Sequence, residues 1–221
     1  MLTACWSVKG GSGTTVVAAA LALGMAGVGR PVVVADFAGD LPAVLGVAEP
    51  AGPGLLDWLD AGPSVPIDGL ARIAHLSDQG VTIVPKGEWS TRAGAGDVDA
   101  GIRLATALRS VRGGNPVIAD CGKVDSAAMR AFIGAADRSL LVLRPCYLAL
   151  RRALQAPRPT AVVLITEPER ALGVGDVEDV LGVPVVASIN WEPSIARAVD
   201  SGLMSARLPR RLANALRDIA A

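Results

Sequence analysis

The chain has 221 residues, close to the upper size for one hydrophobic core, and no linker-like segment interrupts it. We therefore expect a single domain over residues 1–221. Hydrophobic residues make up 51% and charged residues 19% of the chain, a composition that excludes intrinsic disorder. The 21 basic and 21 acidic side chains balance to zero net charge, and no long basic run forms a nucleic-acid footprint. Direct nucleic-acid binding is therefore not expected.

The cysteines, Cys5, Cys121 and Cys146, are widely spaced and match no zinc or disulfide pattern with the lone His75. This usage favours a reducing environment. The first eight residues lack the basic start of an export signal, and the longest apolar stretch, 16–28, is too short and too interrupted by glycine to cross a bilayer. We therefore expect a cytoplasmic protein.

Short runs rich in Val, Ile and Leu predict the strands of a sheet. Within each run the apolar residues are consecutive and do not alternate with polar ones, which is typical of strands buried on both faces of a parallel sheet. Segments with helical spacing or strong helix formers lie between them. We expect strands at 2–7, 32–36, 81–85, 117–120, 140–144, 161–165 and 185–189, and helices at 15–27, 97–112, 126–136, 148–155, 175–181, 193–201 and 209–219.

This alternation predicts an α/β fold, namely a doubly wound, mainly parallel sheet of about seven strands with helices on both faces. Ligands of such folds bind beyond the carboxyl ends of the strands. The segment 39–78, which contains five prolines, is the least regular part. We interpret it as an elaborated crossover with a short helix at 55–59.

A glycine-rich loop follows the first predicted strand and opens the first predicted helix. Glycines let backbone N–H groups converge on one point, and the amino end of a helix adds roughly half a positive charge. The loop therefore predicts an anion-binding cradle, with a purely structural turn as the alternative. Its sequence is Lys9-Gly10-Gly11-Ser12-Gly13-Thr14-Thr15.

This loop resembles the deviant Walker A box, K-G-G-x-G-K-T/S, of the ParA/MinD family of P-loop ATPases. The segment 33–36 resembles the family's second strand with its acidic switch residue, Asp36, and the segment 117–120 resembles the Walker B strand that ends in Asp120. The segments 183–189 and 195–198 are similar to the final strand, adenine-side loop and helix. Nearly the whole chain is covered by the resemblance.

The resemblance implies a homodimer that sandwiches two Mg-ATP molecules and works with a protein partner in a positioning, secretion or pilus system. It places Lys9 where the family's signature lysine reaches the phosphates of the dimer partner, and it assigns magnesium to Thr15, Asp36 and Asp120. The remaining contacts that it implies are those of Gly10, Gly11, Ser12, Gly13 and Thr14 with phosphates, and of Asn190 and Trp191 with adenine. For Trp191, plugging of the pocket and ordinary packing are the alternatives.

Two positions depart from the family pattern. Thr14 stands where a lysine normally holds the phosphates, and a hydroxyl carries no charge. By analogy with a truncated charge pair, this loss weakens nucleotide binding by about 2 to 5 kcal/mol. The family's D-x-D switch has no second acid, because Ala38 takes its place. Asp40 either substitutes for that acid or caps a helix at 41–45.

We therefore expect a degenerate nucleotide site with weak or absent hydrolysis, in which ATP and magnesium binding is weakened or lost. Lys9, Asp36, Asp40 and Asp120 are the candidate catalytic residues. The leading hypothesis is a ParA/MinD-like positioning or partitioning protein that acts as a scaffold or dimer switch, and atypical loops of this kind occur in the TadZ-like branch. The alternative is an active ATP-dependent switch for chromosome or plasmid partition, septum placement or Flp/Tad pilus localisation.

Other enzymes of the superfamily fit less well. An iron–sulfur reductase needs paired cysteines in glycine-rich loops, whereas Cys5 and Cys146 belong to or adjoin predicted strands. A small-molecule ligase needs phosphate chemistry that this loop no longer supports.

Three further features have open interpretations. Lys123 follows Asp120 and is either a replacement cation or a solvated loop residue. Lys86, Trp89 and Arg92 suit either a protein interface or a closed loop around a buried tryptophan. The amphipathic segment 207–219 resembles a membrane-targeting tail, but its apolar residues are no bulkier than core packing needs, so we favour packing on the domain.

Overall fold

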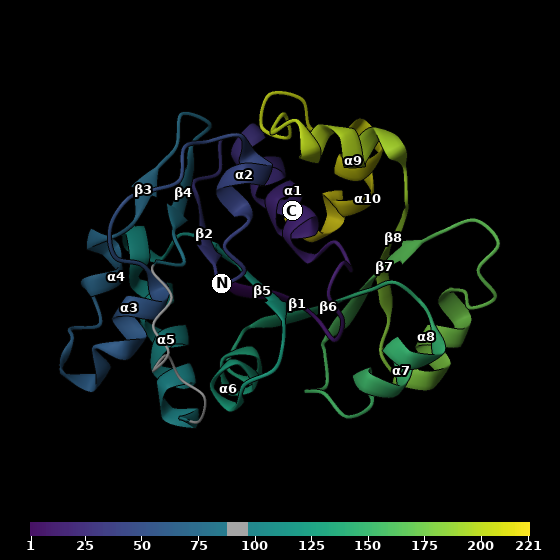
Figure 1. Ribbon diagram of the computed structural model, residues 1–221, viewed down its shortest axis with the longest axis horizontal. Coiled ribbons are helices and arrows are strands. Elements are labelled where there is room, and N and C mark those ends of the chain that lie inside the picture. Colours follow the sequence, from purple (N-terminus) through teal and green to yellow (C-terminus); the bar gives the residue numbers. More distant parts are fainter. Residues whose placement is uncertain (88–96) are drawn as a thin grey trace.

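The computed structural model of the chain describes residues 1–87 and 97–221 (Figure 1). Within these residues eight strands form one sheet in the order β3-β4-β2-β5-β1-β6-β7-β8. β3 pairs antiparallel with β4, and all other pairs are parallel. The strands are β1 (Leu2–Ser7), β2 (Val32–Asp36), β3 (His75–Leu76), β4 (Val81–Val84), β5 (Val117–Lys123), β6 (Arg138–Leu143), β7 (Ala161–Thr166) and β8 (Val185–Asn190).

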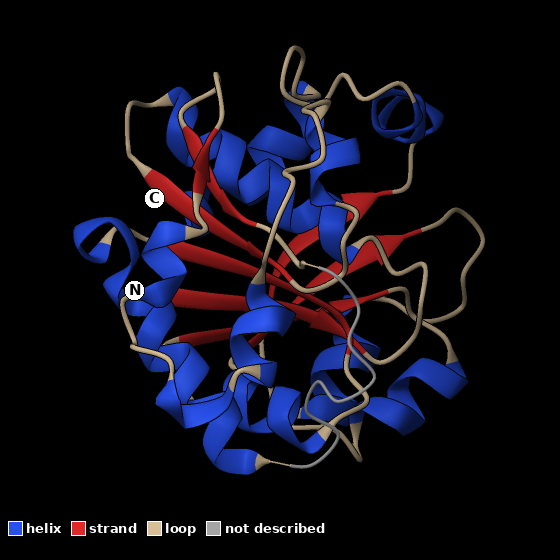
Figure 2. Cartoon of the chain, turned by 60° about the vertical axis from the view of Figure 1, so that its left-hand side comes forward, coloured by secondary structure: helices blue, strands red, loops and turns tan. Residues whose placement is uncertain are grey.

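Helices cover both faces of the sheet (Figures 1 and 2). One face is covered by α1 (Thr14–Gly27), α2 (Leu41–Leu45), α9 (Pro193–Asp200) and α10 (Arg210–Ala220). The other face is covered by α3 (Leu55–Asp60), α4 (Gly69–Arg72), α5 (Val98–Ser110), α6 (Ala127–Gly134), α7 (Tyr147–Ala153) and α8 (Val174–Leu181). Two short 3-10 helices, η1 (Gly62–Ser64) and η2 (Val111–Gly114), complete the described helices.

The central strand β1 places the first loop at the point where the strand order reverses. β1 lies between β5 and β6, and the chain builds the sheet outward on one side of it before crossing to the other. Leu2, Ala4 and Trp6 enter one core layer and Cys5 enters the other, all without solvent exposure. A ligand of a doubly wound sheet is expected beyond the carboxyl end of such a strand.

The predicted fold class is confirmed, with differences at the edges of the sheet. The structure has one strand more than predicted, β3, which consists of two exposed residues without an apolar run. No sequence pattern therefore predicts it. β4 ends at Val84, one residue earlier than predicted, whereas β5 continues past Asp120 to Lys123 because it keeps pairing with β1 through Ser7. The crossover 39–78 contains the expected short helix, α3, together with α4, which the sequence did not predict.

The C-terminal helix α10 packs on the domain. Leu212, Leu216 and Ile219 are buried in the same core layer as α1. The guanidinium groups of Arg30 and Arg138 donate to the last carbonyls of the helix, at 2.7 Å to Ala220 and 2.9 Å to Ile219, groups that helical bonding leaves unsatisfied. The preference for packing is therefore confirmed. In the part of the chain that the structure describes, every helix is too short or too polar to cross a membrane.

Leu216→Ala should reduce the free energy of unfolding by about 2 to 5 kcal/mol, because it leaves a cavity between α10 and the core. Leu154→Ala, at a side chain that is 63% exposed, is the matched control and should change it by less than about 0.5 kcal/mol. Urea denaturation of both variants measures the difference. Equal effects would mean that α10 is not part of the folded core.

Candidate functional site

The loop between β1 and α1 is held in shape by its own side chains. The Ser12 hydroxyl donates to the Lys9 carbonyl at 2.7 Å, and the Ser7 hydroxyl lies 3.1 Å from that same carbonyl and 3.2 Å from the Gly122 carbonyl. Gly11 and Gly13 have φ values of +73° and +87°, in a backbone region that residues with a Cβ rarely adopt. The loop is therefore fixed without any ligand.

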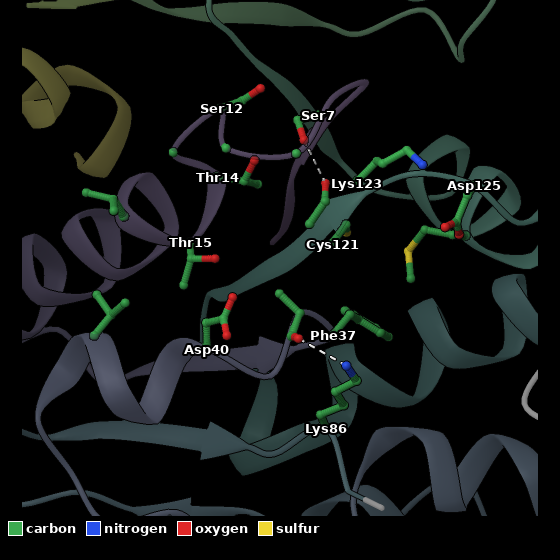
Figure 3. Close-up of a pocket in the computed structure, with 18 of the residues that line it drawn as sticks. Ser7, Ser12, Thr14, Thr15, Phe37, Asp40, Lys86, Cys121, Lys123 and Asp125 are labelled. Carbon is green, nitrogen blue, oxygen red and sulfur yellow. Dashed lines mark hydrogen bonds between the residues drawn. The ribbon is translucent and has the colours of Figure 1, made fainter. Parts of the chain in front are cut away.

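This loop presents backbone N–H groups to a cavity. The first helical hydrogen bond runs from the Val17 N–H to the Gly13 carbonyl at 3.0 Å, so the preceding N–H groups of the helix start have no intrahelical acceptor. Residues 10–16 line a cavity of about 660 Å³ whose other walls include the end of β5 and the loops after β2, β4 and β5 (Figure 3). Together with the dipole of the 14-residue helix α1, these groups make an anion cradle.

Two buried carboxylates lie beside this cradle. Asp36 and Asp120 are register partners at the ends of β2 and β5, and their exposed fractions are 1% and 0%. Asp36 accepts hydrogen bonds from the N–H groups of Gly39 at 2.6 Å and Leu41 at 3.2 Å. Asp120 accepts from Gly122 N–H through Oδ1, whereas no described residue donates a close hydrogen bond to its buried Oδ2.

Burial dominates the electrostatics of these acids. It raises the pKa of Asp36 to about 7, and the neighbouring charge of Asp120 adds to this effect, although the Gly39 and Leu41 N–H groups oppose it. Burial likewise raises the pKa of Asp120 to about 6, against the lowering effects of the Thr15 side chain and the Gly122 N–H. Both carboxyls therefore exchange protons near neutral pH unless a cation compensates their charge.

The oxygen atoms at this site fit a magnesium ion. Mg²⁺ prefers oxygen ligands, takes few from the protein and keeps the rest for water and phosphate. The Thr15 hydroxyl and Asp120 Oδ2 are oxygen atoms of this kind, and their roles as magnesium ligands stay predictions. Asp36 accepts hydrogen bonds from two backbone N–H groups and likewise stays a predicted ligand. In the described part of the chain, no cluster of three or more His, Cys, Asp or Glu side chains offers an all-protein metal site.

Asp40, in the loop after β2, does not cap α2 as one of the two predictions for it required. Asp40 occupies the position that precedes α2, but its side chain makes no capping hydrogen bond, and Asp36 instead accepts from Leu41 at the helix start. The capping role proposed for Asp40 is therefore wrong. Asp40 is exposed, lines the cavity and, in Figure 3, directs its carboxylate into it together with the Thr15 hydroxyl. Its role as the second acid stays a prediction.

The lysines near the cavity have different positions. Lys9 is exposed on the loop, and Lys123 is exposed and extends toward Asp125 in Figure 3. Lys86 is half-buried and donates from Nζ to the Ala38 carbonyl at 3.0 Å inside the cavity wall. It therefore belongs to the cavity rather than to an outer interface. Trp89 and Arg92, predicted with it, lie outside the described residues.

A second cavity, of about 430 Å³, lies on the other side of the loop. It is lined by Gly11 to Gly13, by Asn190 at the end of β8, by Trp191 after that strand, and by Arg144 after β6. Trp191 is 46% exposed, which argues against ordinary core packing. The side-chain oxygen Oδ1 of Asn190 accepts a hydrogen bond from the Thr166 hydroxyl at 2.7 Å. Sequence reasoning missed Arg144, which donates to the Gly11 carbonyl at 3.2 Å and pairs with Glu167.

Comparison with known sequences gives partial matches. No family model matches the chain. Uncharacterised proteins from two strains of Mycobacterium tuberculosis are 30% identical over 155 residues, which cover 67% of this chain and 43% of theirs. The chain thus spans less than half the length of these relatives.

Several solved structures match almost the whole chain. The septum site-determining protein MinD complexed with Mg-ADP from Pyrococcus horikoshii has a TM-score of 0.75 and 22% identity, and covers 99% of this chain and 93% of its own. McdA from Cyanothece has a TM-score of 0.77 and 18% identity, with coverage of 100% and 99%. A ParA family ATPase from Chlorobium tepidum has a TM-score of 0.73 and 18% identity, with coverage of 99% and 98%.

The raised pKa values predict a specific dependence of stability on pH. Because folded Asp36 and Asp120 hold protons to about pH 7 and 6, while their unfolded pKa is near 3.8, the folded state binds more protons in between. Their contribution to the free energy of unfolding should therefore be full below pH 4, fall as pH rises to about 7 and stay constant above it.

Asp120→Asn should flatten this fall and, without ligand, raise stability at pH 8 by on the order of 2 kcal/mol relative to the native chain. Asp78→Asn, at an exposed turn, is the control and should leave the profile unchanged. Urea denaturation from pH 5 to pH 8 measures both. A profile that Asp120→Asn does not alter would show that this carboxyl ionises normally in the fold.

Proposed function

We propose that this chain, which has the fold of the MinD and ParA ATPases, is a nucleotide-binding P-loop domain with a degenerate phosphate site. It binds ATP with magnesium weakly and hydrolyses it at or near background. The observation that carries the proposal is the backbone cradle of residues 10–15, which lines the cavity and lies beside buried Asp120 but has uncharged Thr14 at the start of α1.

Nucleotide binding is supported by two cavities that share Gly11, Ser12 and Gly13 as lining residues. The larger cavity offers N–H donors for phosphates and the Thr15 hydroxyl for magnesium, and buried Asp120 lies beside Thr15. The second cavity, with exposed Trp191, offers an aromatic face for a base. The fold neighbours include MinD with Mg-ADP and a variant of Cyanothece McdA with ATP.

Weak hydrolysis follows from the charges of the site. Phosphoryl transfer requires compensation of the negative charge on the phosphates and an oriented water molecule. Thr14 supplies no cation at the helix start, and Ala38 supplies no acid in the loop after β2. Asp40 is the carboxylate in that loop that reaches the cavity, so any residual turnover depends on it.

The proposed biological role is that of a ParA/MinD-like scaffold or dimer switch in a positioning system. Lys9 is exposed at the tip of the phosphate loop, where it is available to a second copy of the chain. A complex of MinC with MinD from Aquifex aeolicus is among the fold neighbours, which supports a protein partner for this fold. The TadZ-like pilus role is one instance of this proposal.

Thr14→Lys should tighten binding of MgATP by at least about tenfold, because it returns a charge-assisted contact to a preformed cradle. Thr14→Ala is the matched control and should bind about as weakly as the native chain. Calorimetric titration with MgATP and MgADP, together with phosphate release, measures both effects. Failure of Thr14→Lys to gain affinity, or robust turnover by the native chain, would contradict the proposal.

Lys9→Ala should weaken an ATP-dependent dimer and leave the melting temperature of the nucleotide-free protein nearly unchanged, because the exposed side chain supports no contact of the fold. Sedimentation of both proteins with and without MgATP measures the association, and Lys123→Ala is the control. A dimer that responds to neither nucleotide nor Lys9 would remove the switch from the proposed function.

A further inference from the structure

The cavity contains a positive charge that the phosphate-loop motif does not include. Its charged lining groups comprise acidic Asp40 and Asp125 together with Lys86 and Lys123. Buried Asp36 and Asp120 lie behind the same wall. A polyphosphate entering this space meets several carboxylates, so a cation held at a defined place determines how well it binds.

The backbone of Lys86 is fixed by the start of α3. The N–H groups of Leu55 and Leu56 donate to the carbonyls of Pro85 and Lys86 at 2.9 and 3.0 Å. Gly54 packs directly on this segment, because a Cβ on it would lie 2.2 Å from the Gly87 nitrogen. Residues 85–87 are thus held by the start of α3, which lowers the backbone entropy that Lys86 would lose on binding.

The side chain of Lys86 is directed by the loop after β2. Its Nζ donates to the Ala38 carbonyl at 3.0 Å, and a Cβ on Gly39 would lie 3.0 Å from Lys86 Cδ. Gly39 also has a φ of +90°. A side chain at position 39 would be strained and would crowd the lysine, so this glycine suits both the turn and the course of Lys86.

We propose that Lys86 is the replacement cation of this site and binds the terminal phosphate of a nucleoside triphosphate. The inference rests on the proposed nucleotide binding. The phosphate loop forms one wall of the cavity and Lys86 belongs to the wall that faces it in Figure 3. The loop N–H groups hold the inner phosphates, and the group that extends furthest across the cavity meets Lys86.

This placement also connects the terminal phosphate to the loop after β2. The Lys86 ammonium donates to the Ala38 carbonyl. A phosphate oxygen that accepts from the same ammonium joins Ala38 to the ligand through Lys86. The loop that carries Asp40 therefore differs in its contacts between the triphosphate and diphosphate states.

The other lysines fit this role less well. Lys123 is exposed and extends toward Asp125, away from Thr14, in Figure 3. Lys9 is exposed on the outside of its loop, which suits contact with a second chain. Lys86 combines a fixed backbone with a directed side chain, and such preorganisation lowers the cost of binding.

Calorimetric titration of the native chain, Lys86→Met and Lys86→Arg with MgATP and with MgADP tests the inference. Lys86→Met should weaken MgATP by about tenfold or more and MgADP by less than about threefold, and Lys86→Arg should restore most of the loss. Lys123→Met is the matched control. The melting temperature of each variant separates loss of the fold from loss of the ligand contact, because unfolding weakens both nucleotides alike.

The double variant Thr14→Lys/Lys86→Met sharpens this test. If the two positions supply the same charge to the ligand, Lys86→Met should cost less affinity in the Thr14→Lys background than in the native chain. Equal losses for MgATP and MgADP, or a selective loss in Lys123→Met instead, would overturn the role of Lys86 while leaving nucleotide binding intact. Absence of binding to both nucleotides by the native chain and by Thr14→Lys would instead overturn the proposed function itself.

Discussion

The junction between β1 and α1 is the constraint on which the rest of the site depends. β1 is buried on both faces between β5 and β6, so its carboxyl end can only open into the space beyond the sheet. The turn into α1 uses Gly11 and Gly13, and Ser7 at the end of β1 donates to the Lys9 carbonyl of this turn and to the Gly122 carbonyl near the end of β5. The ends of β2 and β4 reach the same edge of the sheet because β2 pairs in parallel with β5 and β4.

Two buried carboxyls at this junction lie next to each other without a compensating positive charge from the phosphate loop. Asp36 and Asp120 lie side by side in the sheet without solvent, and their pKa values rise to about 7 and 6. Neutral N–H groups and Thr14 do not compensate two ionised carboxylates. A divalent cation with a polyphosphate would do so, because the cation serves the acids and the cradle serves the anion. The raised pKa values of the two acids and the proposed binding of a cation thus have one cause, the burial of both carboxyls.

Much of this arrangement was accessible from the sequence because it depends on local patterns. Continuous apolar runs identified the central strands, and the strand–loop–helix context identified the cradle. The C-terminal helix was correctly assigned to the core from the spacing of Leu212 and Leu216. β3 and α4 were missed since they are short and carry no periodic pattern, and their formation depends on pairing with β4 and packing near α5.

The side-chain partners were not accessible, because they join elements that are distant in the chain. The Leu41 N–H at the start of α2 donates to the side chain of Asp36 and not to that of Asp40. This pairing depends on the backbone conformation of the loop between Asp36 and Leu41. Lys86 reaches Ala38, and Arg144 reaches Gly11, across sheet positions that no motif encodes. Both side chains line cavities next to the phosphate loop. A motif-based search misses them because it considers only the loop itself.

The most direct test of this account is a crystal structure of the protein with magnesium and a non-hydrolysable ATP analogue. The account predicts the inner phosphates at the N–H groups of residues 10–15, magnesium between Thr15 and Asp120, and the triphosphate within the cavity of about 660 Å³. A cavity without ligand at saturating analogue, or an analogue bound elsewhere on the molecule, would contradict the account.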